Sequence, residues 1–412
     1  MEFGPIFRAL TRNRARFFLI VAEVALTLAI VANCATLILS ARAEISRPSG
    51  FDDEALLAVS TTPFAEHLAV EEAKAQRVAA DLAGLSAIPG VESASNTNFL
   101  PWRGGGTTMA LQRPGSGQSR NPDDEIGAQF YSADPALAET LGVSLVGGRT
   151  FTEEENQVDT SVFVLQRTTP ILISRVLAER LFPEGAALGK TVQPGEGSGE
   201  GEFTIVGIFD RFYNPMGESS EVVVIFPGRS DMMGAGMDYL VRVEPGKSSA
   251  VAREVEAFLL RAETGRNVRV RTIPEMRGQY HSQDRLLVAS LNGVMALLVL
   301  VTSLGIVGLT AFSVAERRRQ IGTRRALGAT QGAILRYFLL ENWMVTSLGA
   351  LLGIALAIGL NVGLVNFTDA ARLEWQVVAA GVFLLWTIGL GAALGPALRG
   401  ARIAPAIATR NV

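Results

Sequence analysis

The sequence has 412 residues, of which 48% are hydrophobic and 19% charged, and its formal net charge is −3. A charge so close to neutral gives no indication of a nucleic-acid-binding surface. The single cysteine, Cys34, lies in an apolar run and excludes a scaffold of intrachain disulfides. Two histidines and one thiol do not make a recognisable zinc site, so we expect neither a metal site nor metal-dependent catalysis.

The apolar residues concentrate in one block near the N-terminus and three blocks near the C-terminus. The first block would make a helix of about 36 Å, against roughly 30 Å for the hydrocarbon core of a bilayer. It is too long for the apolar region of a signal peptide, and no A-x-A cleavage site follows it before Arg42, so we expect a retained helix. The predicted transmembrane helices cover residues 17–40, 286–314, 338–365 and 375–398.

The arginines predict how these helices cross the membrane. Clusters of arginine next to the ends of the predicted spans lie in segments 1–16, 315–337 and 399–412. The residues concerned are Arg8, Arg12, Arg14, Arg16, Arg317, Arg318, Arg319, Arg324, Arg325, Arg336, Arg399, Arg402 and Arg410. By the positive-inside rule, all three segments are cytoplasmic. Four spans then place both termini inside, residues 43–284 outside, and residues 366–374 in a short outer loop.

A few polar side chains interrupt the predicted spans, namely Glu23, Asn33, Asn292, Glu341, Asn342 and Asn361. A polar group in hydrocarbon needs a partner, so we expect these side chains to face other helices. A proton or substrate path is the alternative, but the spans hold no chain of acidic and histidine residues. Small residues at Gly349–Gly353 and Gly389–Gly391 indicate close helix contacts.

The outer segment alternates strand-like and helix-like patterns. Strands are predicted at 55–60, 91–97, 239–243 and 268–273, and helices at 70–85 and 250–263. These elements predict one α+β subdomain formed by residues 51–103 and 238–274. The intervening residues 104–237 contain further β-prone runs at 170–174, 203–209 and 222–226, which indicate a β-rich insert. The expected fold class is therefore a membrane α-helical protein, with one plus three transmembrane helices and a large α+β extracytoplasmic domain of two subdomains.

One segment of the insert imitates a nucleotide-binding loop. Residues 185–191 read G-A-A-L-G-K-T, one residue shorter than the G-x-x-x-x-G-K-[ST] loop that wraps phosphates before a helix begins. A strand-like segment follows it instead of a helix. The sequence holds no other candidate P-loop and no constellation typical of a catalytic site, so any energy source is expected in another polypeptide.

The cytoplasmic loop between the second and third spans is the most informative segment. Residues 315–329 read A-E-R-R-R-Q-I-G-T-R-R-A-L-G-A, an arginine-rich helix that breaks at Gly328 and restarts as an amphipathic segment over 330–338. Such a helix can be an interfacial anchor or a lever that a cytoplasmic protein moves.

This loop resembles the E-R-x-x-E-I-G-x-R-R-A-L-G-A signature of MacB/FtsX-type permeases, where it carries the coupling helix that docks on the ATPase. The matching residues are Glu316, Arg317, Ile321, Gly322, Arg324, Arg325, Ala326, Leu327, Gly328 and Ala329. Gln320 stands where the family usually has Glu. Residues 395–406 are similar to the closing P-A-x-R-A-A-R-x-x-P-A segment, and residues 181–190 to the L-F-P-x-x-x-x-x-G-K run of MacB-type periplasmic domains.

The resemblance implies a permease subunit of the inner membrane with a periplasmic domain. Its implied partners are a separate cytoplasmic ABC ATPase, which carries the ATP and Mg, a second permease, either identical or a sister chain, and membrane lipid. No cofactor is expected on this chain. A periplasmic adaptor and an outer-membrane channel are further possible partners.

The implied mechanism is mechanotransmission, in which the ATPase moves the coupling helices and thereby the periplasmic domains. The expected result is export or extraction of a peptide, lipoprotein or amphipathic compound. The alternatives are an FtsX-like transmitter that regulates an envelope partner and a membrane scaffold outside the ABC class. The size of the outer domain favours the transporter over the transmitter.

Overall fold

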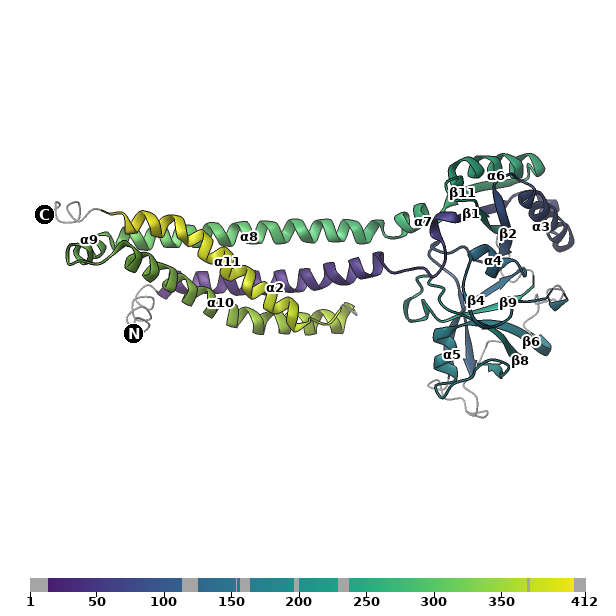
Figure 1. Cartoon of the computed structure of the whole chain (residues 1–412), viewed down its shortest axis with the longest axis horizontal. Helices are drawn as coiled ribbons and strands as arrows, with labels where there is room; N and C mark the ends of the chain where they lie inside the picture. The colour runs from purple at the N-terminus through teal and green to yellow at the C-terminus, as the bar shows by residue number, and fades with distance from the viewer. Residues whose placement is uncertain are drawn as a thin grey trace. The chain divides into compact units, whose positions relative to one another are not determined.

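The computed structural model describes residues 14–112, 125–152, 154–155, 164–195, 200–228, 237–368 and 371–403. The chain divides into a helical unit, Met1–Ser46 with Gln283–Val412, and an outer unit, Arg47–Ser282 (Figure 1). Each unit has its own hydrophobic clusters, so each is described by itself.

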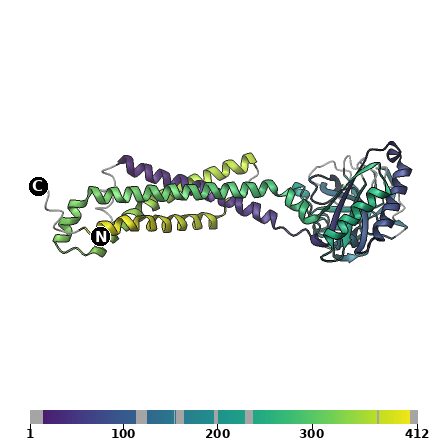
Figure 2. The same ribbon diagram turned by 90° about the horizontal axis from the view of Figure 1, so that it is seen from above.

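Long helices run lengthwise through the helical unit (Figures 1 and 2). They are α2 (Arg14–Ile45), α8 (Ser282–Glu316), α10 (Gln331–Thr368) and α11 (Trp375–Ala401). Each contains a stretch long and apolar enough to cross a membrane, which confirms the predicted order of one plus three. The helices extend past the predicted apolar spans because helical turns continue through the polar ends. For example, the Ala333 N–H donates to Thr330 Oγ1 over 3.2 Å, which caps α10 well before residue 338.

Glycines let the helices of this unit approach closely. A Cβ built on Gly353 of α10 would lie 2.9 Å from the backbone oxygen of Ala25 in α2, and one on Gly349 would lie 2.7 Å from Val24. Gly389 of α11 is in similar contact with Thr346, at 3.0 Å. A Cβ on Gly391 would meet nothing within 4 Å, so the predicted contact there is wrong for the described part of the chain.

The polar residues of the spans find different surroundings. Asn361 of α10 donates to Asn33 Oδ1 of α2 over 3.2 Å, and Asn33 donates to the Ala357 oxygen over 3.1 Å. The carboxylate of Glu23 lies against Gly305 of α8. Asn292 is exposed and donates to the Val288 oxygen of its own helix over 2.7 Å. The expectation that Asn292 faces another helix is therefore wrong within this chain, because bonding one turn back already satisfies one of its donors.

The first part of the outer unit is a sheet in the order β11-β1-β10-β2, whose neighbouring strands are antiparallel. The strands are β1 (Leu56–Pro63), β2 (Val91–Thr97), β10 (Met237–Val243) and β11 (Arg266–Thr272). Alternate residues such as Val59 and Val241 point to one face, where they pack against α3 (Glu71–Ser86) and α6 (Ser248–Ala262).

A buried ion pair ties this layer together. The Arg266 guanidinium donates to both carboxylate oxygens of Asp81, and the Tyr239 hydroxyl donates to Asp81 Oδ2 over 2.8 Å. Arg266 also donates to the Leu259 oxygen of α6 over 3.0 Å. A buried charge is tolerated when it is paired and hydrogen-bonded in this way.

The second part of the outer unit is a closed ring of strands. Its strands are β3 (Thr107–Gln112), β4 (Glu125–Ala133), β6 (Val164–Ser174), β7 (Thr191–Pro194), β8 (Glu200–Phe209) and β9 (Val223–Pro227). They pair in the order β4-β3-β7-β8-β6-β9, and a parallel β4–β9 pairing closes the ring. Closure removes free strand edges. The interior is filled by apolar side chains such as Leu111, Ile173 and Phe203.

Short elements complete the outer unit. They are β5 (Leu145–Gly148), which pairs with β8, the helices α4 (Leu137–Leu141), α5 (Arg175–Leu181) and α7 (Ile273–Tyr280), and 3₁₀ turns at Asp53–Ala55, Glu66–Ala69 and Gly217–Ser219. The two strand groups meet where Thr97 of β2 pairs with Ala133 of β4. The group β1, β2, β10 and β11 comes from the predicted α+β part, and the ring comes from the predicted insert.

Candidate functional site

A short helix, α9 (Arg318–Ala326), follows α8 and is joined to α10 by a tight turn. Gly328 adopts a φ of +98°, which an L side chain rarely accepts. The Ala329 N–H donates to the Arg324 oxygen over 3.0 Å and the Gly328 N–H to the Arg325 oxygen over 3.1 Å. These two bonds are those of a Schellman motif, which ends a helix at a left-handed glycine. The A-L-G-A-T sequence therefore ends α9 and, through Thr330, begins α10.

One side of α9 is anchored to the neighbouring helices. Ile321 is buried and belongs to a cluster with Phe338 of α10 and Ala397 of α11. Arg325 is half-buried, and its Nη1 donates to the Ile403 oxygen over 2.7 Å. The inner side of α9 is thus held by one apolar side chain and one hydrogen bond to the segment after α11.

Arg317, at the junction of α8 and α9, is also held in place. Its Nη1 donates to Glu341 Oε2 over 2.9 Å and to the Tyr337 hydroxyl over 3.0 Å. The Glu341 side chain is only 8% exposed and the Arg317 side chain 20%. This ion pair fixes the junction to α10, because separating its members would leave a buried charge without a partner.

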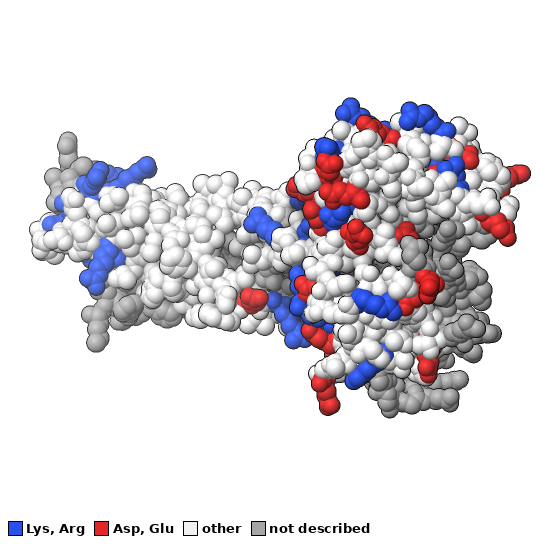
Figure 3. Space-filling model, turned by 45° about the vertical axis from the view of Figure 1, so that its right-hand side comes forward, with Lys and Arg blue, Asp and Glu red and all other residues white. Residues whose placement is uncertain are grey.

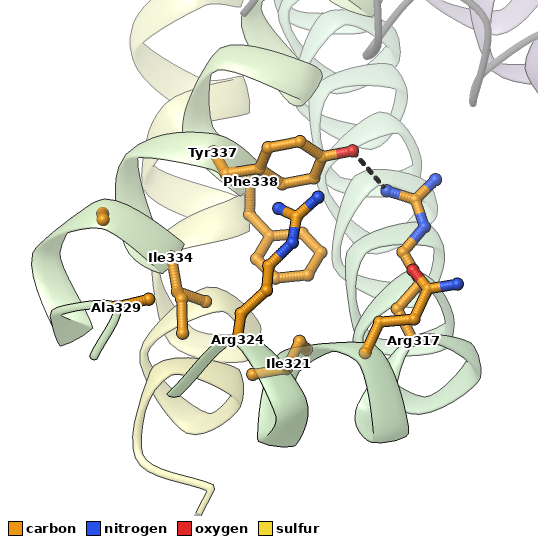
Figure 4. A pocket seen from close by; sticks show the side chains of 9 residues that line it. Arg317, Ile321, Arg324, Ala329, Ile334, Tyr337 and Phe338 are labelled. Carbon is orange, nitrogen blue, oxygen red and sulfur yellow. Dashed lines mark hydrogen bonds between the residues drawn. The ribbon is translucent and has the colours of Figure 1, made fainter. Parts of the chain in front are cut away.

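A pocket of about 120 Å³ opens between α9 and the first turns of α10. Gln320, Ile321 and Arg324 line it from α9, and Ile334, Tyr337 and Phe338 from α10 (Figure 4). The guanidinium of Arg324 lies 5.5 Å from the centre of the Tyr337 ring, which is the geometry of a cation–π contact. The pocket is therefore lined by both apolar side chains and arginines.

The other side of α9 is open. Leu327, at the apex of the turn, is 83% exposed, and Glu316, Gln320, Arg324 and Ala326 are exposed as well. The surface seen in Figure 3 has almost no charged side chains along the middle of the helical unit, while basic side chains gather at the end that carries α9. A large apolar side chain among arginines at this end is a candidate contact for another protein.

The predicted coupling residues thus divide into two groups. Arg317, Ile321, Gly322 and Arg325 are buried or half-buried against the chain itself. Glu316, Ala326, Leu327 and Gly328 are exposed to solvent, and Gln320, Arg324 and Ala329 line the pocket. The contribution of Ala333, Ile334, Tyr337 and Phe338 to this site was not predicted from the sequence. Their spacing of three and four residues could have predicted this contribution, because it puts their side chains on one face of α10.

The glycine-rich segment that imitates a P-loop has a different structure. Thr191 begins β7, so a strand follows the loop, as predicted. Lys190 lies over the ring of Phe182, with Nζ 4.6 Å from the ring centre. The lysine is therefore engaged with the L-F-P part of the same motif.

Two family models match the chain. The model of the MacB-like periplasmic core domain matches residues 20–258, more than half of the chain, and that of the FtsX-like permease C-terminal domain matches residues 292–405. The chain belongs to the MacB/FtsX-like ABC transporter permease family. The second match includes α9, the turn and the pocket.

Relatives agree with this membership. The ABC transporter permease YknZ of Bacillus subtilis (strain 168) is 26% identical over 304 residues, which cover 71% of this chain and 72% of YknZ. The macrolide export ATP-binding/permease protein MacB of Neisseria gonorrhoeae (strain ATCC 700825 / FA 1090) is 24% identical over 294 residues, or 69% of this chain. The match spans 44% of that MacB, so this chain corresponds to less than half of it.

A solved structure also resembles the chain. The crystal structure of the periplasmic region of MacB from Actinobacillus actinomycetemcomitans aligns with 57% of this chain and 97% of its own, at 12% identity and a TM-score of 0.37. Family membership places the outer unit in the class of MacB-like periplasmic domains and the helical unit in a membrane.

Proposed function

We propose that this chain is the permease subunit of an ABC transporter whose ATPase is a separate cytoplasmic polypeptide, with ATP and Mg bound there. The observation that carries the proposal is Leu327, exposed at the apex of the α9–α10 turn while the inner side of α9 is fixed to α10 and α11. Because Leu327 lies at the end of an anchored helix, a partner bound to it could displace α9 together with the helices that α9 contacts. A loop without such contacts would deform instead.

Orientation supports the same proposal. Arginines of α9, of the α8–α9 junction and of the segment after α11 belong on the cytoplasmic side by the positive-inside rule, which leaves the outer unit in the periplasm. In the proposed mechanism, movement of α9 travels along α8 and, through the packing of α10 on α2, along α2, the two helices that lead into the outer unit, and it drives export or extraction of a peptide, lipoprotein or amphipathic compound. A second permease, identical or a sister chain, would complete a complex with two ATPase subunits. An adaptor and an outer-membrane channel would extend it across the envelope.

A second candidate function is transmission of a signal to an envelope partner, as in FtsX-like proteins. It uses the same site and movement and differs in what the outer unit acts on. An adaptor in the purified complex would favour export, and a cell-wall hydrolase would favour signal transmission.

Copurification from mild detergent tests the coupling site. An ABC ATPase identified by mass spectrometry should accompany the wild-type chain and the conservative variant Leu327→Met, and be lost with Leu327→Asp. Leu327 is the site of choice because its side chain is largely exposed, whereas replacing Arg325 would also break its bond to the Ile403 oxygen. Equal recovery of the ATPase with Leu327→Asp and wild type would rule out this contact.

A further inference from the structure

A second concave site lies in the outer unit, on the sheet face opposite α3 and α6. Its volume is about 460 Å³, and it is lined by Ser60, Thr62, Arg103, Asn267, Arg269 and Arg271. The strand register explains the grouping, because Ser60 of β1 pairs with Arg269 of β11, and Thr62 pairs with Asn267. Side chains of paired residues point to the same face of a sheet. Hydroxyl, amide and guanidinium donors therefore converge on one concavity.

The positive charge in this pocket exceeds the negative charge that faces it. Arg103 is paired with the buried carboxylate of Asp238, at 2.5 Å. Arg271 donates to the neutral Gln279 Oε1 over 2.7 Å, and among the described residues no carboxylate forms an ion pair with Arg269 or Arg271. The nearby Glu275 accepts the Thr272 N–H over 3.0 Å as part of the α7 cap.

The crowding of these arginines has an electrostatic signature. Burial, followed by the positive charges of Arg269 and Arg103, lowers the pKa of Arg271, and Glu275 opposes the shift. Like charges held together in a partly desolvated concavity repel one another unless an anion lies between them. An oxyanion would replace that repulsion with charge-assisted hydrogen bonds.

We propose that this pocket binds a phosphate group, either free phosphate or the phosphate of a lipid headgroup. Phosphate oxygens accept several hydrogen bonds at once, and the fork of an arginine suits two of them. The hydroxyl of Thr62 and the amide of Asn267 supply neutral donors beside the guanidinium groups of Arg269 and Arg271, while the Ser60 hydroxyl donates to Asp238. The volume exceeds that of a single phosphate and leaves room for a group attached to it. This site does not depend on the coupling function of α9.

A competing explanation is that the arginines only protect an edge. Among the described strands, β11 lies at the end of the sheet order, and charged side chains on edge strands prevent pairing with other chains. Under that explanation, Arg269 and Arg271 would contribute no more to phosphate binding than any other exposed arginine of the outer unit. Arg261, on α6 and outside the pocket, is therefore the matched control.

Calorimetric titration of the full-length protein in phosphate-free dodecyl maltoside tests the proposal, with inorganic phosphate and glycerol 3-phosphate as probes. Arg269→Ala and Arg271→Gln should each weaken binding about tenfold or more, since each removes charge-assisted hydrogen bonds. Arg261→Ala should bind as the wild type does. Thermal unfolding midpoints equal to that of the wild type would show that the variants are folded.

The two probes separate the sources of phosphate. Tighter binding of glycerol 3-phosphate supports a lipid headgroup, and equal binding supports free phosphate. No heat with either probe on the wild type would overturn the proposal. Equal binding by Arg269→Ala, Arg271→Gln and Arg261→Ala would overturn it too and leave the arginines as edge protection.

Discussion

The Arg317–Glu341 pair is the residue-scale feature on which the coupling site depends. Arg317→Ala should lower the stability of the helical unit by about 3–5 kcal/mol, because it leaves the buried Glu341 carboxylate without its partner. Adding Glu341→Gln to that variant should recover part of the loss, since the unpaired charge is then gone. Thermal unfolding in detergent measures both effects.

Arg318→Ala is the matched control for this prediction. Arg318 is adjacent and exposed, so its replacement should change stability by no more than about 0.5 kcal/mol. Equal losses for the two single variants would show that Arg317 has no special structural role.

Asp238, in the outer unit, predicts a pH effect. The pKa of its carboxyl is raised to about 6. Burial causes the rise, and the charge of Arg103 and the hydrogen bonds from Ser60 and Thr61 make the rise smaller. Because this pKa is above the unfolded value, the folded state binds the proton more tightly, and the carboxyl stabilises the fold most at acid pH. Its contribution to the free energy of unfolding should fall by about 2 kcal/mol as pH rises from about 4 to about 6.

The Asp238→Asn variant removes this titration. Its unfolding midpoint, measured from pH 4 to pH 7, should depend less on pH than that of the wild type. If both proteins show the same pH dependence, the carboxyl does not titrate in this range.

At the scale of elements, the contact of α2 with α10 depends on Gly353. Gly353→Ala would bring a Cβ to 2.9 Å from the Ala25 oxygen, so the two helices must separate. We expect a loss of about 1–3 kcal/mol, typical of overpacking. Gly363→Ala in the same helix is the control, because a Cβ there meets nothing within 4 Å and alanine favours a helix over glycine. Unfolding midpoints that move together for the two variants would contradict the close contact.

Individual elements could be predicted where the pattern was local. The strand predicted at 91–97 coincides with β2, and the four apolar blocks predict the four long helices. Closure of the ring could not be predicted, because β4 and β9 are remote in sequence and no local pattern specifies that they pair. The strand β3, T-T-M-A-L-Q, was missed because its alternation consists of only two large apolar side chains, Met109 and Leu111, in a run of six residues.

The candidate site was predicted in part for a similar reason. The motif around Gly328 has a local physical meaning, a helix end followed by a helix start, and so could be recognised. The partnership of Arg317 with Glu341 depends on how the turn folds α10 back onto α9, and those residues are 24 positions apart. The charged groups of the site could therefore be predicted, but not which of them pair.

At the scale of the whole molecule, the central claim is that ATP hydrolysis outside this chain changes its outer unit. The change would start at the anchored short helix α9 of the helical unit and reach the MacB-like domain formed by residues 47–282. Hydrogen exchange measured by mass spectrometry reports such a change whether the second permease is identical or a sister chain.

The most direct measurement compares hydrogen exchange of the permease–ATPase complex without nucleotide and trapped with ATP and vanadate. We expect altered exchange in peptides from residues 47–282 of the wild type. We expect no alteration with Leu327→Asp under the same conditions. Unchanged exchange throughout those residues in a wild-type complex that hydrolyses ATP would show that hydrolysis does not change the outer unit.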